Sequence, residues 1–149
     1  MQQIFSRIVQ TVRANWNHWT TQNQDPEVLL EQAIQVLQDE MIQLRQAVAQ
    51  AIATYKRTER QYRQAQDRSQ EWYVQAERAM AQQQEGVARE ALTQRKILLD
   101  ASLVLDQQLE PQQQIIHRLK QDLRSLELKL ADALRIGRFL LLLGPPLEP

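Results

Sequence analysis

The chain has 149 residues, of which only three are Gly, five are Pro and none is Cys, and its 18 Lys and Arg balance its 18 Asp and Glu. The balance argues against bulk nucleic-acid binding, which needs a basic face, and the absence of Cys excludes disulfides and thiolate metal sites. Long stretches of Ala, Glu, Gln, Leu, Arg and Lys are typical of coiled coils. No apolar run approaches the roughly 18–20 residues that span a bilayer, and no signal-peptide pattern begins the chain. We therefore expect an all-α protein that is cytoplasmic, or at most peripheral on a membrane.

Residues 1–22 are predicted to form an amphipathic helix. At about 100° per residue, the apolar side chains fall within an arc of roughly 140°. No acidic residue precedes Asp25, so the segment is net positive. A face with Phe and Trp beside Arg suits a lipid interface, but it equally suits packing on the rest of the chain or on a neighbouring chain. The candidate membrane-binding residues are Ile4, Phe5, Arg7, Ile8, Val9, Val12, Arg13, Trp16 and Trp19.

A strong helix start follows at Asp25-Pro26-Glu27, because Asp favours the N-cap, Pro the first helical position and Glu the positive end of the helix dipole. From there the contact positions step by four and three residues, the 3.5-residue repeat of a supercoiled helix. This first track consists of Leu30, Ile34, Leu37, Met41, Leu44, Val48, Ala51, Tyr55, Thr58, Tyr62, Ala65, Ser69, Trp72, Ala76 and Ala79.

The repeat breaks at AQQQEG, where Gly86 suggests a turn at 83–86. A second track with the same repeat then follows: Ala88, Ala91, Arg95, Leu98, Ser102, Leu105, Leu109, Gln112, Ile116, Leu119, Leu123, Leu126, Leu130 and Ala133. Two near-equal arms joined by a short turn predict a long antiparallel coiled-coil helical hairpin. The expected organisation is an amphipathic helix at 1–22, a hairpin at 23–136 with arms of about 27–82 and 87–136, and an irregular apolar, Pro-rich tail at 137–149.

Apolar residues also lie off the two tracks, which widens the apolar stripe beyond what one partner helix covers and predicts self-association. These residues are Val28, Leu29, Val36, Ile52, Tyr73, Ile97, Leu99, Val104, Ile115 and Leu128. Pro111 interrupts the second arm at a cost of up to about 3 kcal/mol, either as a hinge or as a tolerated kink.

Residues with catalytic or metal-binding chemistry are scarce. The two His residues, His18 and His117, are about a hundred positions apart and have no ligand at metal spacing nearby. No Gly-rich phosphate loop occurs, and the carboxylates alternate with Arg and Lys as on a solvated helix face. We expect no enzyme activity, no metal and no cofactor.

Several runs resemble the phage-shock protein A (PspA) family, which includes the vesicle-inducing protein in plastids and is related to the ESCRT-III membrane-remodelling proteins. They include the Asp25-Pro26-Glu27 cap, LRQAVAQAIA at 44–53 and KRTERQY at 56–62. The resemblance covers roughly residues 4–133 and is closer to the cyanobacterial and plastid branch. It implies binding to anionic or stressed membranes through the first helix, above all Phe5, Ile8, Val9, Val12 and Trp16 with Arg7.

The resemblance further implies a homo-oligomer that maintains or remodels the inner or thylakoid membrane in a stress response. Some family members restrain an AAA+ transcription activator, so a coiled-coil interaction module is the alternative function. The chain departs from the family after Ala133, where a further Lys-rich helical stretch is expected, and at Pro111. A truncated paralogue that co-assembles with a full-length relative is therefore a third interpretation.

Overall fold

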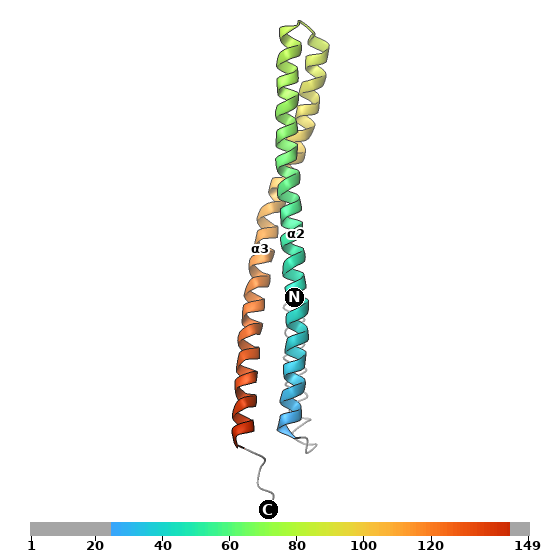
Figure 1. Ribbon diagram of the computed structural model, residues 1–149. Coiled ribbons are helices and arrows are strands. Elements are labelled where there is room, and N and C mark those ends of the chain that lie inside the picture. The colour runs from blue at the N-terminus through green and yellow to red at the C-terminus, as the bar shows by residue number, and fades with distance from the viewer. Residues whose placement is uncertain (1–24, 144–149) are drawn as a thin grey trace, which may run out of the picture. The chain divides into compact units, whose positions relative to one another are not determined.

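The computed structural model describes residues 25–143, which form two helices joined by a short turn (Figure 1). Helix α2 spans Pro26–Ala81 and helix α3 spans Glu85–Leu143, and no strand occurs in this part of the chain. The described residues belong to two compact units, each with a stretch of α2 and an antiparallel stretch of α3. The turn unit is Gln46–Gln121, and the end unit combines the residues up to Arg45 with those from Asp122. The predicted all-α helical hairpin is confirmed.

Helix α2 begins at the predicted cap. The Asp25 Oδ1 atom accepts a hydrogen bond from the backbone N–H of Glu27 at 3.1 Å. The Asp25 carbonyl oxygen accepts from the N–H groups of Val28 and Leu29 at 3.1 and 3.3 Å. Side chain and carbonyl together therefore satisfy N–H groups that a helix start leaves without partners.

The turn ends α2 with a left-handed residue. Gln83 has a φ of 59°, its N–H donates to the Met80 carbonyl at 3.0 Å, and the Gln84 N–H donates to the Ala79 carbonyl at 2.8 Å. These two bonds form a Schellman motif, whose left-handed position usually holds Gly. The prediction of a turn built on Gly86 differs from the structure, because Gly86 lies inside the first turn of α3. The hydrogen bonds of the α2 end, not the nearest Gly, decide where the chain reverses.

The placement of the turn predicts that Gln83→Gly and Gly86→Ala both stabilise the hairpin. The first removes left-handed strain of about 1 kcal/mol. The second gains about 1 kcal/mol of helix propensity, since a Cβ at Gly86 meets nothing within 4 Å. Urea unfolding followed by circular dichroism measures both changes. If Gly86→Ala destabilised the hairpin instead, the result would indicate that the turn requires Gly86 and would contradict its placement before α3.

The core of the turn unit is built mostly from small side chains. Ala76 and Ala79 of α2 are 3% and 4% exposed, and Ala88 and Ala91 of α3 are 1% and 3% exposed. Both tracks run away from the turn with the same repeat, and every position on them is buried or half-buried. Small residues at these positions let the two helix backbones approach closely, so little room remains for a larger side chain.

Three hydroxyl groups are buried in the same core without a partner on the opposite helix. The hydroxyl of Thr58 donates to the Thr54 carbonyl at 3.1 Å. Ser69 donates to the Gln66 carbonyl at 2.7 Å, and Ser102 donates to a carbonyl one turn earlier in α3 at 2.8 Å. Because each hydroxyl is satisfied within its own helix, its burial leaves no unpaired donor, and the polar interruptions of the tracks are tolerated.

Overpacking the small core provides a test of the close approach. Ala88→Leu places three additional carbon atoms at a position that is 1% exposed and should destabilise the hairpin by roughly 1–3 kcal/mol. Ala101→Leu makes the same change on an exposed position of α3 and should stay within about 0.5 kcal/mol of the original chain. Thermal unfolding measures both, and equal effects would contradict close packing at Ala88.

The end unit has a core of larger side chains. Leu29, Met41 and Leu126 are buried there, and the intervening track positions are half-buried. Arg45 of α2 and Glu127 of α3 form an exposed ion pair at 3.9 Å, which contributes little because solvent screens it. Leu29 was expected off the track, yet it is buried, so the apolar stripe near the start of α2 is wider than the strict repeat.

Helix α3 continues beyond its predicted end at residue 136. Residues 137–143, expected to belong to an irregular tail, are helical as far as Leu143. A Cβ at Gly137 would lie 3.3 Å from the Leu30 Cδ2 atom, so the backbone of α3 still contacts α2 at this point. Leu and Phe are compatible with a helix, and Gly137 is the residue that permits this close approach. The loss of the repeat ended neither the helix nor its contact with α2.

Pro111 lies within α3 and does not end it. Its ring occupies an exposed position, where it can be accommodated away from α2. Pro lacks the N–H that the carbonyl four residues earlier would accept. The next residue, Gln112, has a buried Oε1 atom without a hydrogen-bond partner among the described residues. Hydrogen bonding is therefore incomplete at this point of α3.

Candidate functional site

The predicted lipid-binding face lies outside the described residues. All nine candidates, Ile4, Phe5, Arg7, Ile8, Val9, Val12, Arg13, Trp16 and Trp19, precede Asp25. They remain a prediction from the sequence. What the structure contributes is the surface of the two helices that follow.

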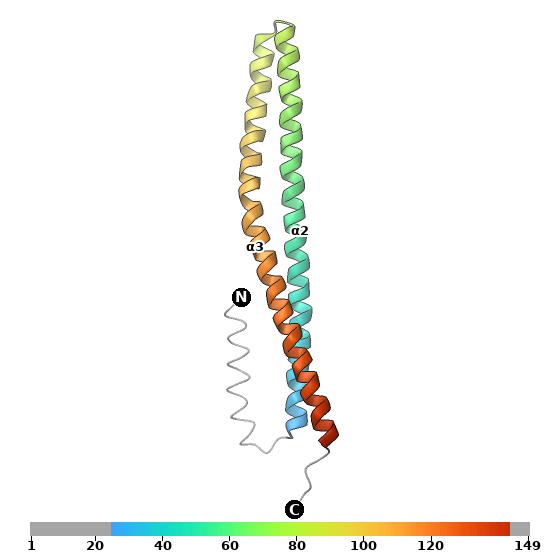
Figure 2. The same cartoon turned by 90° about the vertical axis from the view of Figure 1, so that its left-hand side faces the viewer.

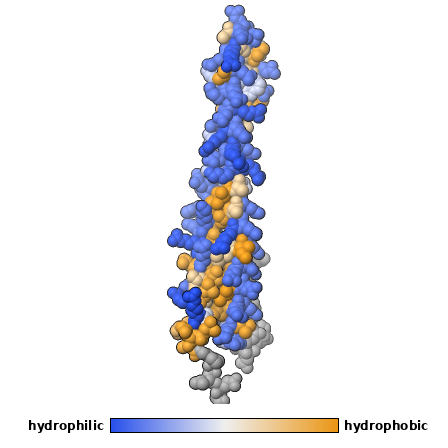
Figure 3. All heavy atoms as spheres, in the orientation of Figure 1, coloured by the Kyte–Doolittle hydropathy of each residue, from blue (hydrophilic) through white to orange (hydrophobic). Residues whose placement is uncertain are grey.

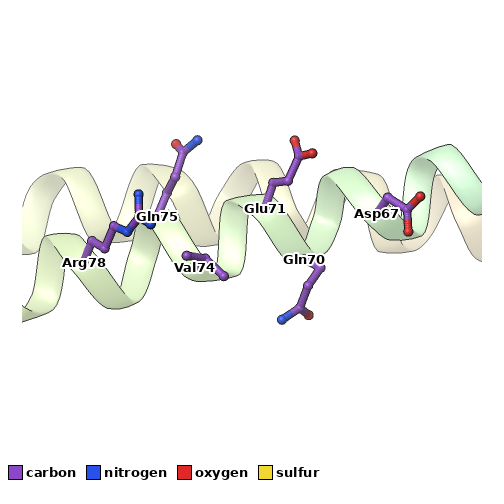
Figure 4. Close-up of a pocket in the computed structure, with 6 residues that line it drawn as sticks. All are labelled: Asp67, Gln70, Glu71, Val74, Gln75 and Arg78. Carbon is purple, nitrogen blue, oxygen red and sulfur yellow. The ribbon is translucent and has the colours of Figure 1, made fainter.

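The hairpin surface offers depressions but no enclosed pocket among the described residues. One depression is lined by six residues of α2 alone, and Figure 4 shows their side chains leaving the same helix in different directions. Its lining residues are Asp67, Gln70, Glu71, Val74, Gln75 and Arg78. A neighbouring depression adds Leu98 of α3 to residues of α2. Side chains on one exposed helix face cannot surround a substrate or exclude water from it.

Metal-binding chemistry is also missing from residues 25–143. No group of three or more His, Asp or Glu side chains in this range could hold a metal ion. His117 is exposed, and its Nε2 atom lies 3.2 Å from the Gln121 amide nitrogen one turn along α3. Within 25–143, no helix is long and apolar enough to cross a bilayer.

The turn unit exposes large apolar side chains on both edges of α3. Ile97 and Val104, seven residues apart, are 56% and 55% exposed on one edge. Leu92 and Leu99 repeat the pattern on the other edge at 44% and 39%. Of the other residues expected off the track, Val28, Val36, Ile115 and Leu128 are exposed, whereas Ile52 and Tyr73 are half-buried. The wide apolar stripe inferred from the sequence is thus largely uncovered in the single chain.

The end unit exposes a second apolar surface, where the sequence predicted an apolar tail but not a helix. Figure 3 shows apolar side chains gathered along α2 and α3 here, including the last turns of α3. Phe139, Leu141, Leu142 and Leu143 are each more than 60% exposed. The sequence did contain a signal that the helix continues to residue 143, because five good or fair helix formers directly precede Gly144, and Gly is a typical helix stop.

One polar residue on the second track is stabilised by an aromatic neighbour. Arg95 occupies a half-buried position, and its guanidinium carbon lies 4.6 Å from the centroid of the Tyr73 ring. Stacking on the ring compensates part of the cost of placing a cation beside the core. The contact joins α3 to α2.

The described part of the chain is thus a helical hairpin whose distinctive property is exposed apolar surface. The chain matches the PspA/IM30 family over residues 3–140. It belongs to this family, as the motifs in its first arm predicted. The match begins ahead of the hairpin and therefore includes most of the amphipathic segment.

Curated relatives extend the match. The chain is 41% identical over 130 residues to the membrane-associated protein Vipp1 of Nostoc punctiforme, covering 87% of this chain and 50% of the relative. It is 35% identical over 130 residues to the chloroplastic membrane-associated protein VIPP1 of Arabidopsis thaliana, covering 87% and 39%. A phage shock protein A homolog of Deinococcus radiodurans is 32% identical over 129 residues, covering 87% and 58%. The chain spans about half the length of the bacterial relatives and less of the plant protein.

Proposed function

We propose that this chain is a peripheral membrane-binding protein whose first helix binds anionic bilayers and whose hairpin brings several chains together on the surface. One observation carries the proposal: the family match starts at residue 3 and thus includes the amphipathic segment, and relatives in that match are named as membrane-associated. Membrane maintenance or remodelling at an inner or thylakoid membrane is the matching physiological role.

The chemistry of residues 1–22 supports lipid binding. Phe5 and Trp16 belong to the apolar face, and aromatic rings of this kind favour the boundary between headgroups and acyl chains. In the predicted helix, Arg7 and Arg13 fall outside the apolar face, where attraction to anionic lipid adds about 1 kcal/mol per charge. No acidic side chain before Asp25 opposes this attraction.

Co-sedimentation with liposomes tests the first helix. Phe5→Glu combined with Val12→Glu should abolish pelleting with phosphatidylglycerol vesicles, because two carboxylates enter the apolar face. Gln3→Glu combined with Gln10→Glu is the matched control, with the same spacing and charge change on the polar face. The control should pellet more weakly than the original chain but remain bound. Equal pelleting of all three proteins would show that this face does not contact lipid.

The exposed edges of α3 support self-association. Ile97 and Val104 are separated by one heptad, so they lie on the same edge of α3 and form a short strip that a helix of a second chain can cover. Burial of such side chains yields about 25 cal/mol per Å² of apolar surface. A strip on each edge allows one hairpin to contact two neighbours, which is a requirement for an open assembly.

Disruption of one strip tests the assembly. Ile97→Glu combined with Val104→Glu should shift the protein toward the monomer in light scattering and in analytical ultracentrifugation. Gln107→Glu combined with Gln114→Glu has the same seven-residue spacing and charge change on exposed positions and should leave the distribution unchanged. If the original chain is monomeric, self-association is contradicted. If it assembles only after it is mixed with a longer relative, the hairpin co-assembles with that relative and does not self-associate.

A further inference from the structure

We propose that the last turn and a half of α3 is a second lipid-binding element, which inserts end-on into the interface of the same anionic bilayer. We call it the apolar tip and define it as Phe139, Leu140, Leu141, Leu142 and Leu143. The proposal rests on the proposed function, since it assumes that the chain binds membranes. It adds a contact on the hairpin itself, and the family match ends at residue 140, before most of the tip.

The apolar tip is uncovered in the structure. Leu142 is 86% exposed and Leu141 is 73% exposed, the two highest values among the exposed large apolar residues. Leu140 alone is half-buried, on the side of the second track. Single exposed apolar residues are ordinary, but four exposed residues among five consecutive apolar ones form a contiguous surface of the kind that marks an interaction site.

The arrangement of the tip favours a bilayer over a partner helix. Five consecutive residues at about 100° each point in all directions around the helix. A packed helix covers only one stripe of its neighbour, whereas a lipid interface surrounds a helix end on every side. Five residues also span about 7.5 Å along the axis, within the roughly 5–10 Å depth to which interfacial helices insert.

The charges next to the tip match an anionic surface. Arg138 directly precedes Phe139, and Arg135 lies about one turn earlier. No acidic residue occurs between Asp132 and Leu143. Arg135 is paired with Asp132, whereas Arg138 makes no ion pair with another residue in 25–143. An Arg at the base of an inserted tip can extend to the phosphate groups while the apolar side chains enter the lipid.

The tip lies near the point at which α2 begins. Gly137, two residues before the tip, contacts Leu30 of α2, and α2 starts only four residues earlier at Pro26. The segment 1–22 is therefore joined to the same end of the end unit from which the tip extends. Two lipid-binding elements at one end can bind one membrane together, and their binding then becomes cooperative.

A fluorescent probe on the tip tests the insertion directly. The chain has no Cys, so Leu142→Cys provides a unique site for bimane, and Leu128→Cys provides a matched control. Leu128 is 63% exposed on the same helix but lies about 21 Å further from its end. Both labelled chains are bound to phosphatidylglycerol vesicles that contain lipids brominated on the acyl chains. Bimane at 142 should lose most of its fluorescence, and bimane at 128 should lose little.

Every other outcome overturns the proposal. Co-sedimentation without quenching at 142 excludes the tip and leaves the first helix as the lipid anchor. If neither the labelled chains nor the unlabelled chain co-sediments with the vesicles, the proposed membrane-binding function is contradicted as well. A blue-shifted bimane at 142 in the absence of vesicles, unchanged when they are added, would show that a second copy of the chain covers the tip.

Discussion

The contact line between two helices dominates this structure, because a helix packed against a single partner can bury only one stripe of its surface. All positions of both tracks are buried or half-buried, yet no large side chain within residues 25–143 is fully buried. The apolar area that a pair of helices removes from water is small, and the conformational entropy of ordering long arms is large. Exposed apolar residues on the outer edges are therefore available for contacts with lipid or with further chains. The small size of the core and the exposed apolar surface on which the proposed function depends thus have the same cause: each helix packs against a single partner.

The sequence predicted the hairpin well because the repeat of four and three has one physical solution. Even Thr58, Ser69 and Arg95, polar interruptions of the tracks, occupy contact positions. Their hydroxyl groups are satisfied inside the helix, and the Arg95 guanidinium stacks on Tyr73. The pattern could be followed through them since each has a local way to reduce the cost of burial. The cap at Asp25 was equally predictable, because it depends only on adjacent residues.

The turn and the end of α3 could not be located as well. The turn was predicted at 83–86 because the repeat breaks there and Gly86 is a helix breaker, whereas the connection is Gln82–Gln84 and its left-handed residue is Gln83. The closing hydrogen bonds depend on where α2 stops, which tertiary packing decides. At the other end, loss of the heptad repeat was interpreted as loss of helix. A helix needs backbone hydrogen bonds and permissive residues, and the repeat only reports what it packs against. The candidate site at residues 1–22 remains a prediction, because the described residues begin after it.

The small core of the turn unit also affects how the register between the arms is maintained. Beside the turn, the buried Ala side chains of the two tracks form a smooth surface without the interlocking that large side chains provide. The buried hydroxyl groups bond within their own helices, so they do not connect the arms either. Next to the turn, the three-residue connection at Gln82–Gln84 limits how far one arm can slide along the other. Further along, the contact between Arg95 and Tyr73 also connects the two arms. Slippage by a single heptad would displace α3 along α2 by about 10 Å. A connection of three residues therefore restricts the registers that the two arms can adopt.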